Sequence, residues 1–180
     1  MRCIWLILTK CRLISTSKPD PVITMQWSDV INDPSLKNLP FKIELNRYGK
    51  IEMTPASNKH GRLQLFLGNR LEQNLKNGET ITECSIQTTE GVKVADVAWC
   101  SKDFIARHGY ETPYSQAPEI CVEIVSPSNS REEMLKKTQC YLEAGAGEIW
   151  IVWENGLIDY YDASGKIEKS KMNVEIHLPS

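Results

Sequence analysis

Several features that would assign this 180-residue chain to a common protein class are missing from its sequence. The formal net charge is only −2 at pH 7, so no overall positive field favours non-specific binding to nucleic acid, although a local basic groove is compatible with it. The chain also lacks a P-loop, a GxGxxG fingerprint, an HExxH pair and a GxSxG elbow. These absences argue against nucleotide-phosphate, zincin and hydrolase-elbow sites.

The six cysteines form no CxxC pair and no Cys/His spacing typical of a zinc site. Four of them, Cys84, Cys100, Cys121 and Cys140, fall inside apolar segments. We therefore predict reduced cysteines that pack as small hydrophobic side chains, without a disulfide framework. This usage is typical of a cytoplasmic protein, and we expect that localisation.

Near the N-terminus, the apolar run at residues 4–8 is too short for a membrane span or for the h-region of a secretory signal, and Lys10 and Arg12 follow it directly. We therefore expect no membrane partner. Residues 1–24 are interpreted as an extension outside the core, with natural translation beginning at Met25. Residues 25–180 are expected to form a single domain, which is long enough to bury a substantial core.

Hydrophobic periodicity predicts helices and strands in alternation. Apolar residues alternate on both sides of residues 46–49 and predict an N-terminal β-hairpin. Leucines recur every four positions in a predicted helix over 60–76, and a second helix is predicted over 131–144. Segments rich in valine and isoleucine predict strands at 80–87, 92–100, 120–125, 148–153 and 157–161. The predicted fold class is α/β (α+β), with a mixed β-sheet flanked by helices.

Two acidic residues lie inside apolar strand segments. Asp96 belongs to VKVADVAW and Glu123 to PEICVEIVSPS. Charged side chains are rarely buried without a partner, so each acid requires an explanation. If the two strands pair side by side, the carboxylates would come within reach of one metal ion, although the sequence does not fix the register. Mg²⁺ commonly takes one or two carboxylates and leaves its other positions to water and phosphate oxygens.

Lys137 lies at the edge of the apolar stripe of the helix over 131–144. Lys136 lies opposite the centre of that stripe and should be solvated. Neighbours three positions before and four positions after Lys137 can guide its side chain toward the sheet, although both lysines could instead be ordinary surface charges. With the two acids, the amine predicts a metal-dependent phosphodiesterase site. The residues of the stripe are Met134, Leu135, Thr138, Tyr141 and Leu142.

Five further residues are candidate accessory groups. His60 and Gln64 lie one helical turn apart and could face the same pocket, although a lone histidine near a helix start is more often structural. Glu44 in the hairpin could add an outer carboxylate or could face solvent. Ser126 and Ser128 precede the second helix, where they could hold a phosphate oxygen but where helix capping is the ordinary role.

The run from about residue 25 to residue 170 resembles the Uma2 family of restriction endonuclease-like proteins, which is abundant in cyanobacteria and belongs to the PD-(D/E)XK nuclease superfamily. The matching segments keep their order and are KIELNRYGKIEMTPASNKHGRLQ, TECSIQTTEGVKVADVAW, APEICVEIVSPSNS and EEMLKKTQCYLEAGAGEIWIV. The superfamily core is a helix, three strands, a helix and a further strand, which is the order predicted above. The resemblance therefore implies a restriction endonuclease-like core.

The resemblance also implies roles for individual residues. Asp96 corresponds to the metal-binding aspartate and Glu123 to the acid of the (D/E)XK element. Val125 stands where the usual lysine would be, and Lys137 takes the place of a helix lysine that is thought to substitute in Uma2-like sequences. Ala95 replaces the proline that usually precedes the aspartate.

The function implied is that of an Mg²⁺-dependent endonuclease acting on DNA, in which Mn²⁺ can substitute. The alternative is a catalytically silent nucleic-acid-binding or protein-interaction module on the same fold. A homodimer is expected from the frequency of two-fold dimers, with the aromatic C-terminal strands as its candidate face.

Overall fold

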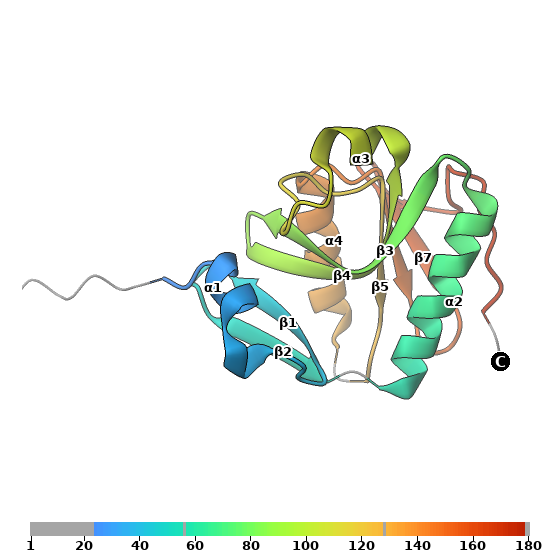
Figure 1. Cartoon of the computed structure of the whole chain (residues 1–180). Coiled ribbons are helices and arrows are strands. Elements are labelled where there is room, and N and C mark those ends of the chain that lie inside the picture. The colour runs from blue at the N-terminus through green and yellow to red at the C-terminus, as the bar shows by residue number, and fades with distance from the viewer. Residues whose placement is uncertain (1–23, 56, 128, 179–180) are drawn as a thin grey trace, which may run out of the picture.

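The computed structural model describes residues 24–55, 57–127 and 129–178, which build an eight-stranded sheet with helices on its faces (Figure 1). The expected extension at residues 1–24 therefore lies outside the described residues except for Thr24, and Ser128 also lies outside them. In chain order the elements are α1 (Trp27–Asn32), a 3₁₀ turn (Pro34–Leu36), β1 (Phe41–Asn46), β2 (Ile51–Pro55), α2 (Asn58–Asn74), β3 (Gly78–Thr88), β4 (Gly91–Ser101), α3 (Lys102–His108), β5 (Ile120–Ile124), α4 (Arg131–Glu143), β6 (Glu148–Val152), β7 (Ile158–Asp162) and β8 (Gly165–Ile167).

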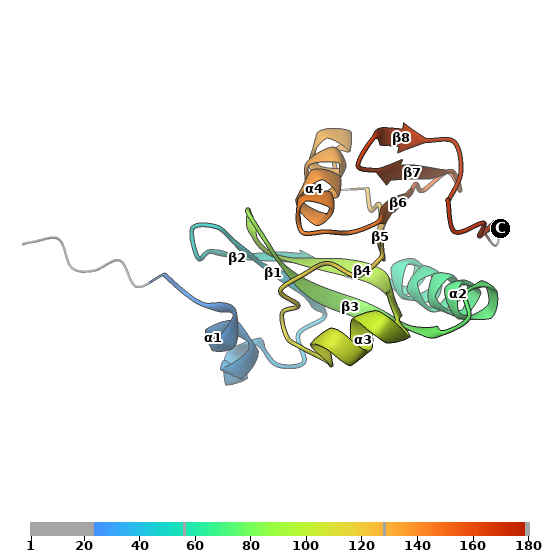
Figure 2. The same cartoon turned by 90° about the horizontal axis from the view of Figure 1, so that it is seen from above.

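The sheet runs in the order β2-β1-β4-β5-β6-β7-β8, and β3 pairs with β4 off this path. Strands β5 and β6 are parallel, whereas the other pairs are antiparallel, so the predicted mixed sheet and α+β class are confirmed. Helices α2 and α4 lie on opposite sides of β5 in both views (Figures 1 and 2).

Strand alternation explains how the two helices cover opposite faces. Leucines of α2, including Leu67 and Leu71, pack in one core cluster with Val122 of β5. Tyr141 of α4 packs in another cluster with Cys121, which points to the other face of the same strand. Four cysteines are free and buried, as predicted, and Cys3 and Cys11 lie outside the described residues.

Two details of the predicted fold are wrong. Between the strands predicted at 92–100 and 120–125 no helix was predicted, but residues 102–108 form α3, which Ser101 caps and Phe104 anchors in the core. A helix of two turns offers too few residues for a visible apolar period. Leu135 belongs to the predicted apolar stripe of the helix but is 39% exposed, because the buried part of the stripe is narrower and follows Met134, Thr138 and Tyr141.

The predicted dimer face is also weakened, because aromatic residues of the C-terminal strands serve the fold itself. Trp150 and Tyr161 are buried inside the chain, and Trp153 packs beneath the guanidinium of Arg131. The homodimer therefore stays a prediction without support from these side chains.

Strand β4 pairs with two different strands, β1 and β5, along one of its edges, and we call the place where these two strands diverge the fork. One edge pairs with β3 from Gly91 to Ser101. The other edge is shared, because β1 pairs with Gly91 and Val92 whereas β5 pairs with residues 97–99. Gly91 permits the close approach of β1, since a Cβ there would lie 2.1 Å from the carbonyl oxygen of Leu45. Residues 93–96 are left facing the gap between β1 and β5, and Asp96 lies there.

Candidate functional site

The register of β4 and β5 brings the two predicted acids together. The ladder pairs Ala98 with Cys121 and Val97 with Val122, so Asp96 and Glu123 occupy the next opposing positions. The Asp96 carboxylate accepts a hydrogen bond at Oδ2 from the backbone N–H of Ile124 at 2.6 Å. This bond fixes the Asp96 side chain, and both acids are almost fully buried, at 1% and 3% exposure.

A lysine that the sequence analysis did not single out lies between the two carboxylates. The Lys42 Nζ is 2.6 Å from Asp96 Oδ1 and 3.0 Å from Glu123 Oε2. Strand alternation was the signal that could have found it, because Lys42 and Glu44 alternate with apolar Ile43 and Leu45 and must share one face of β1. That face turns toward the fork in the sheet.

Lys137 also reaches the site, from the side of α4. Its Nζ lies 2.8 Å from Glu44 Oε1 and 3.4 Å from both oxygens of Glu123. Lys136 instead points away, with a side chain that is 67% exposed and paired with Glu90. The two lysines therefore point in the directions that their positions on the helix predicted.

Glu44 is buried rather than solvent-facing, at 7% exposure. Besides Lys137, its carboxylate accepts a hydrogen bond from the backbone N–H of Val94 and lies 3.4 Å from Lys93 Nζ. Burial opposes its ionisation, but the surrounding ammonium groups prevail and hold the pKa of Glu44 below its ordinary value. It acts as a shared counter-ion for two lysines.

Tyr141 supports Glu123 from beneath. Its hydroxyl donates to Glu123 Oε1 at 2.6 Å, and the aromatic ring is fully buried. Burial raises the pKa of Glu123 despite the nearby Lys137 and Lys42. For Asp96, burial is outweighed by Lys42 and His60, which keep its pKa below the ordinary value. The two acids therefore have opposite tendencies to bind a proton.

His60 and Gln64, which lie one turn apart on α2, both contact Asp96. The His60 Nε2 lies 3.1 Å from Asp96 Oδ1, and the Gln64 amide donates to the backbone oxygen of Asp96 and to Glu83. Glu83 has a φ of 52°, and the β3–β4 pairing is interrupted where it faces Asp96. One ligand atom from each of His60, Glu83 and Asp96 lies within 4.8 Å of the others.

Ser126 lies at the rim of the site, and its hydroxyl donates to Asn129 Oδ1 at 2.7 Å. The capping role belongs to Ser130, whose hydroxyl accepts from the backbone N–H of Glu133. Ser126 and Asn129 line a cavity of about 30 Å³ together with Lys42, Thr54, Pro55, His60, Glu83, Asp96, Glu123, Ile124 and Lys137. Five of the predicted site residues thus border one small polar space, whereas Glu44 and Gln64 do not line it.

These residues fit a divalent metal ion. Asp96 Oδ1 and Glu123 Oε2 converge on a single cation, the Lys42 ammonium, so the two oxygens already share one cation position. Carboxylate oxygens are the ligands that Mg²⁺ and Mn²⁺ prefer. Val125, which lies two residues after Glu123, packs in the apolar core.

The arrangement of strands and helices in this chain is shared with a solved protein. A crystal structure described as "a putative nuclease belonging to DUF820", from Anabaena variabilis, superposes with a TM-score of 0.63 and covers 76% of this chain and 86% of that chain, at 18% sequence identity. The family model described as "Uma2: Putative restriction endonuclease" matches residues 34–174, and the chain belongs to that family. No curated protein matches the sequence.

Within the described residues, no helix has the length and apolar content that crossing a membrane would require.

Proposed function

We propose that this protein is a metal-dependent endonuclease that hydrolyses phosphodiester bonds in DNA. The observation that carries the proposal is the convergence of Asp96 and Glu123, from adjacent strands, on one cation position. Membership of a family described as a restriction endonuclease supports the same reaction class. Asp96 and Glu123 would hold Mg²⁺, for which Mn²⁺ can substitute.

When bound, the metal ion would supply an activated water and polarise the scissile phosphate. The chain positions its ligands through groups already in place, since the Ile124 N–H holds Asp96 and the Tyr141 hydroxyl holds Glu123. Lys137 would stabilise negative charge that develops on the phosphate, because its ammonium borders Glu123 and its side chain is only 12% exposed. His60, Gln64, Glu44 and Ser126 would orient these groups.

A second candidate function is a catalytically silent nucleic-acid-binding or protein-interaction module. The observation that favours it is the Lys42 ammonium, which pairs with both carboxylates. The two candidates differ in metal binding, since an ion that binds the native state raises the melting temperature by mass action. A silent module of this kind would show no such rise with Mg²⁺ or Mn²⁺.

Cleavage of supercoiled plasmid DNA tests the leading proposal. With Mg²⁺ or Mn²⁺ present, we expect the wild type to nick the plasmid, and Asp96→Asn and Lys137→Ala to lose about 100-fold or more of that rate, as removal of a preorganised charged group typically does. Lys136→Ala is the matched control, because Lys136 is the exposed neighbour of Lys137 and should keep the wild-type rate. Equal cleavage by all four proteins would assign the activity to a contaminant or another site.

A further inference from the structure

The cation position between Asp96 and Glu123 is already filled by a group of the chain itself. Lys42 Nζ makes two charge-assisted contacts, at 2.6 and 3.0 Å, and its side chain is only 10% exposed. Lysine side chains are rarely this buried without a specific partner. Here the partners are the two carboxylates that the proposed function assigns to the metal. The Lys42 ammonium and the metal ion would therefore occupy the same position.

The hairpin holds Lys42 in this position. Strand β1 is anchored to β4 at Leu45 and Asn46, and to β2 along its length, where Lys42 lies opposite Thr54. Leu45 packs against Trp27 and Val30 of α1, on the face of β1 away from the site. The backbone of Lys42 is therefore fixed, and only its flexible four-carbon side chain is free to move the ammonium.

The buried carboxylates of the cluster already have cationic partners from the chain. Glu44, Asp96 and Glu123 are in contact with three lysines, Lys42, Lys93 and Lys137. A divalent ion placed beside an ammonium that stayed between the same two oxygens would bring like charges into contact, at a high cost inside a protein. Binding of the metal and retention of Lys42 are therefore mutually exclusive.

Resting on the proposed function, we infer that Lys42 is an internal counter-ion that competes with the divalent metal for Asp96 and Glu123. Metal binding then requires the ammonium to withdraw from between the carboxylates. The apparent affinity for the metal is reduced by the fraction of molecules in which Lys42 has withdrawn. If that fraction is about 10% or less, removal of the ammonium strengthens metal binding about tenfold or more.

Titration calorimetry with Mn²⁺ tests the competition on the full chain. Lys42→Met should bind Mn²⁺ about tenfold or more tightly than the wild type. Lys93→Met is the matched control, because it removes one positive charge from the same cluster while contacting Glu44 and Glu52 instead of the two ligands. It should change the affinity much less. An equal increase in Mn²⁺ affinity in both variants would show that the loss of any nearby positive charge strengthens binding, and it would overturn the inference. Unchanged or weaker binding of Mn²⁺ by Lys42→Met would overturn it as well.

A second variant covers the case in which Lys42→Met fails to fold because two buried carboxylates lose their counter-ion. Lys42→Arg keeps the positive charge and can bind both carboxylates with its planar fork, so it should bind Mn²⁺ more weakly than the wild type. Tighter or equal binding by Lys42→Arg would contradict competition.

The same titrations separate failure of this inference from failure of the proposed function. If the wild type and Lys42→Met bind Mn²⁺ equally, and Asp96→Asn abolishes the binding, the metal site stands and the competition is wrong. If neither protein binds Mn²⁺, the proposed metal site itself is wrong, and the inference is overturned with it.

Discussion

At the scale of single residues, the site consists of acids whose partners are fixed by packing. Asp96 receives the Ile124 N–H, the Lys42 ammonium and His60, so each of its oxygens has a partner. Breaking a buried ion pair by removing one member is strongly destabilising, because the other charge is left uncompensated. The stability of the fold and the charge state of Asp96 are therefore linked.

We therefore predict that the free energy of unfolding differs between the wild type and Asp96→Asn by an amount that depends on pH. The pKa of Asp96 is depressed in the folded protein, so the ionised acid contributes stability above the unfolded pKa, which is about 4, and loses it as the pH falls through the folded value. At pH 7 we expect Asp96→Asn to lower the free energy of unfolding by about 3 kcal/mol. The deficit should shrink steadily as the pH falls below about 4.

Urea denaturation at several pH values measures this difference. Asp103→Asn, which removes an exposed carboxylate from α3, reports the effect of charge loss at the surface. A deficit for Asp96→Asn that is the same at pH 3 and pH 7 would contradict the assigned role of the ionised carboxylate.

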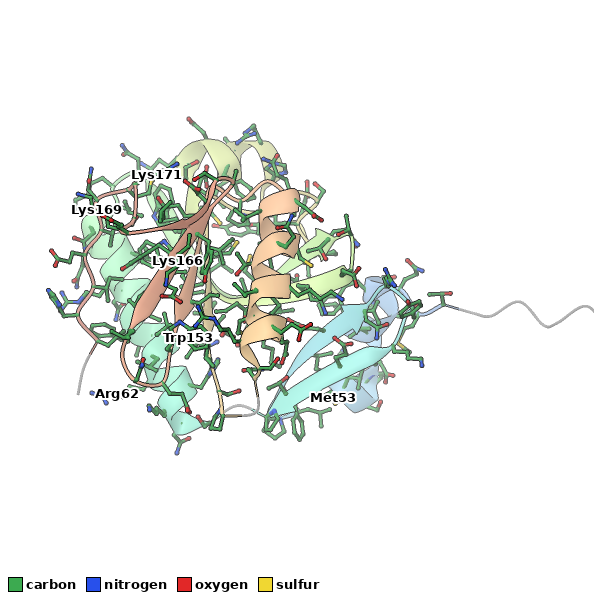
Figure 3. All side chains as sticks on the ribbon, turned by 180° about the vertical axis from the view of Figure 1, so that it is seen from behind. Met53, Arg62, Trp153, Lys166, Lys169 and Lys171 are labelled. Atoms are coloured by element: carbon green, nitrogen blue, oxygen red, sulfur yellow. The ribbon has the colours of Figure 1, made fainter. Side chains whose placement is uncertain are left out.

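At the scale of elements, the site depends on the fork in which β1 and β5 share one edge of β4. This arrangement requires a glycine at position 91. The φ of Gly91 is 99°, and its close contact with the Leu45 carbonyl leaves no room for a side chain. Lys42 and Glu44 reach the site only when β1 is seated there. Figure 3 shows the same hairpin, with Met53 labelled on β2, beside the start of α4.

Substitution of Gly91 by alanine should unseat the hairpin. We expect Gly91→Ala to lower the free energy of unfolding by more than the roughly 1–3 kcal/mol typical of a strained backbone conformation, since the added Cβ also displaces β1. Gly156→Ala is the matched control, because Gly156 also has a positive φ but has open space where its Cβ would lie. Chemical denaturation compares the two, and an equal loss in both would show that the close approach of β1 does not matter.

The elements also show what the sequence could and could not predict. Long periodic segments such as 58–74 and the acids within apolar strands were visible, because each depends on local pattern. Lys42 was missed because its role arises from contacts with residues 54 and 81 positions away. Short α3 and the exposure of Leu135 were missed because tertiary packing determines both.

At the scale of the whole molecule, the chain provides a mixed sheet with a cluster of buried acids and lysines at its fork. Next to this cluster lies a larger cavity of about 420 Å³, between the hairpin and α4, which Lys93, Lys136 and Lys137 line together with Arg47 and Tyr48. Glutamates also line it, so the cavity is mixed in charge rather than basic. Under the proposed function, the metal position and Lys137 are the features that would meet a phosphate.

The central claim, that Asp96 and Glu123 hold a divalent ion, is tested most directly by anomalous scattering from crystals soaked in Mn²⁺. We predict an anomalous peak between Asp96 Oδ1 and Glu123 Oε2, with the Lys42 ammonium moved out of that position and Lys137 still beside Glu123. A soaked crystal in which Lys42 still bridges the two carboxylates, with no peak between them or with a peak only at His60 and Glu83, would contradict the claim.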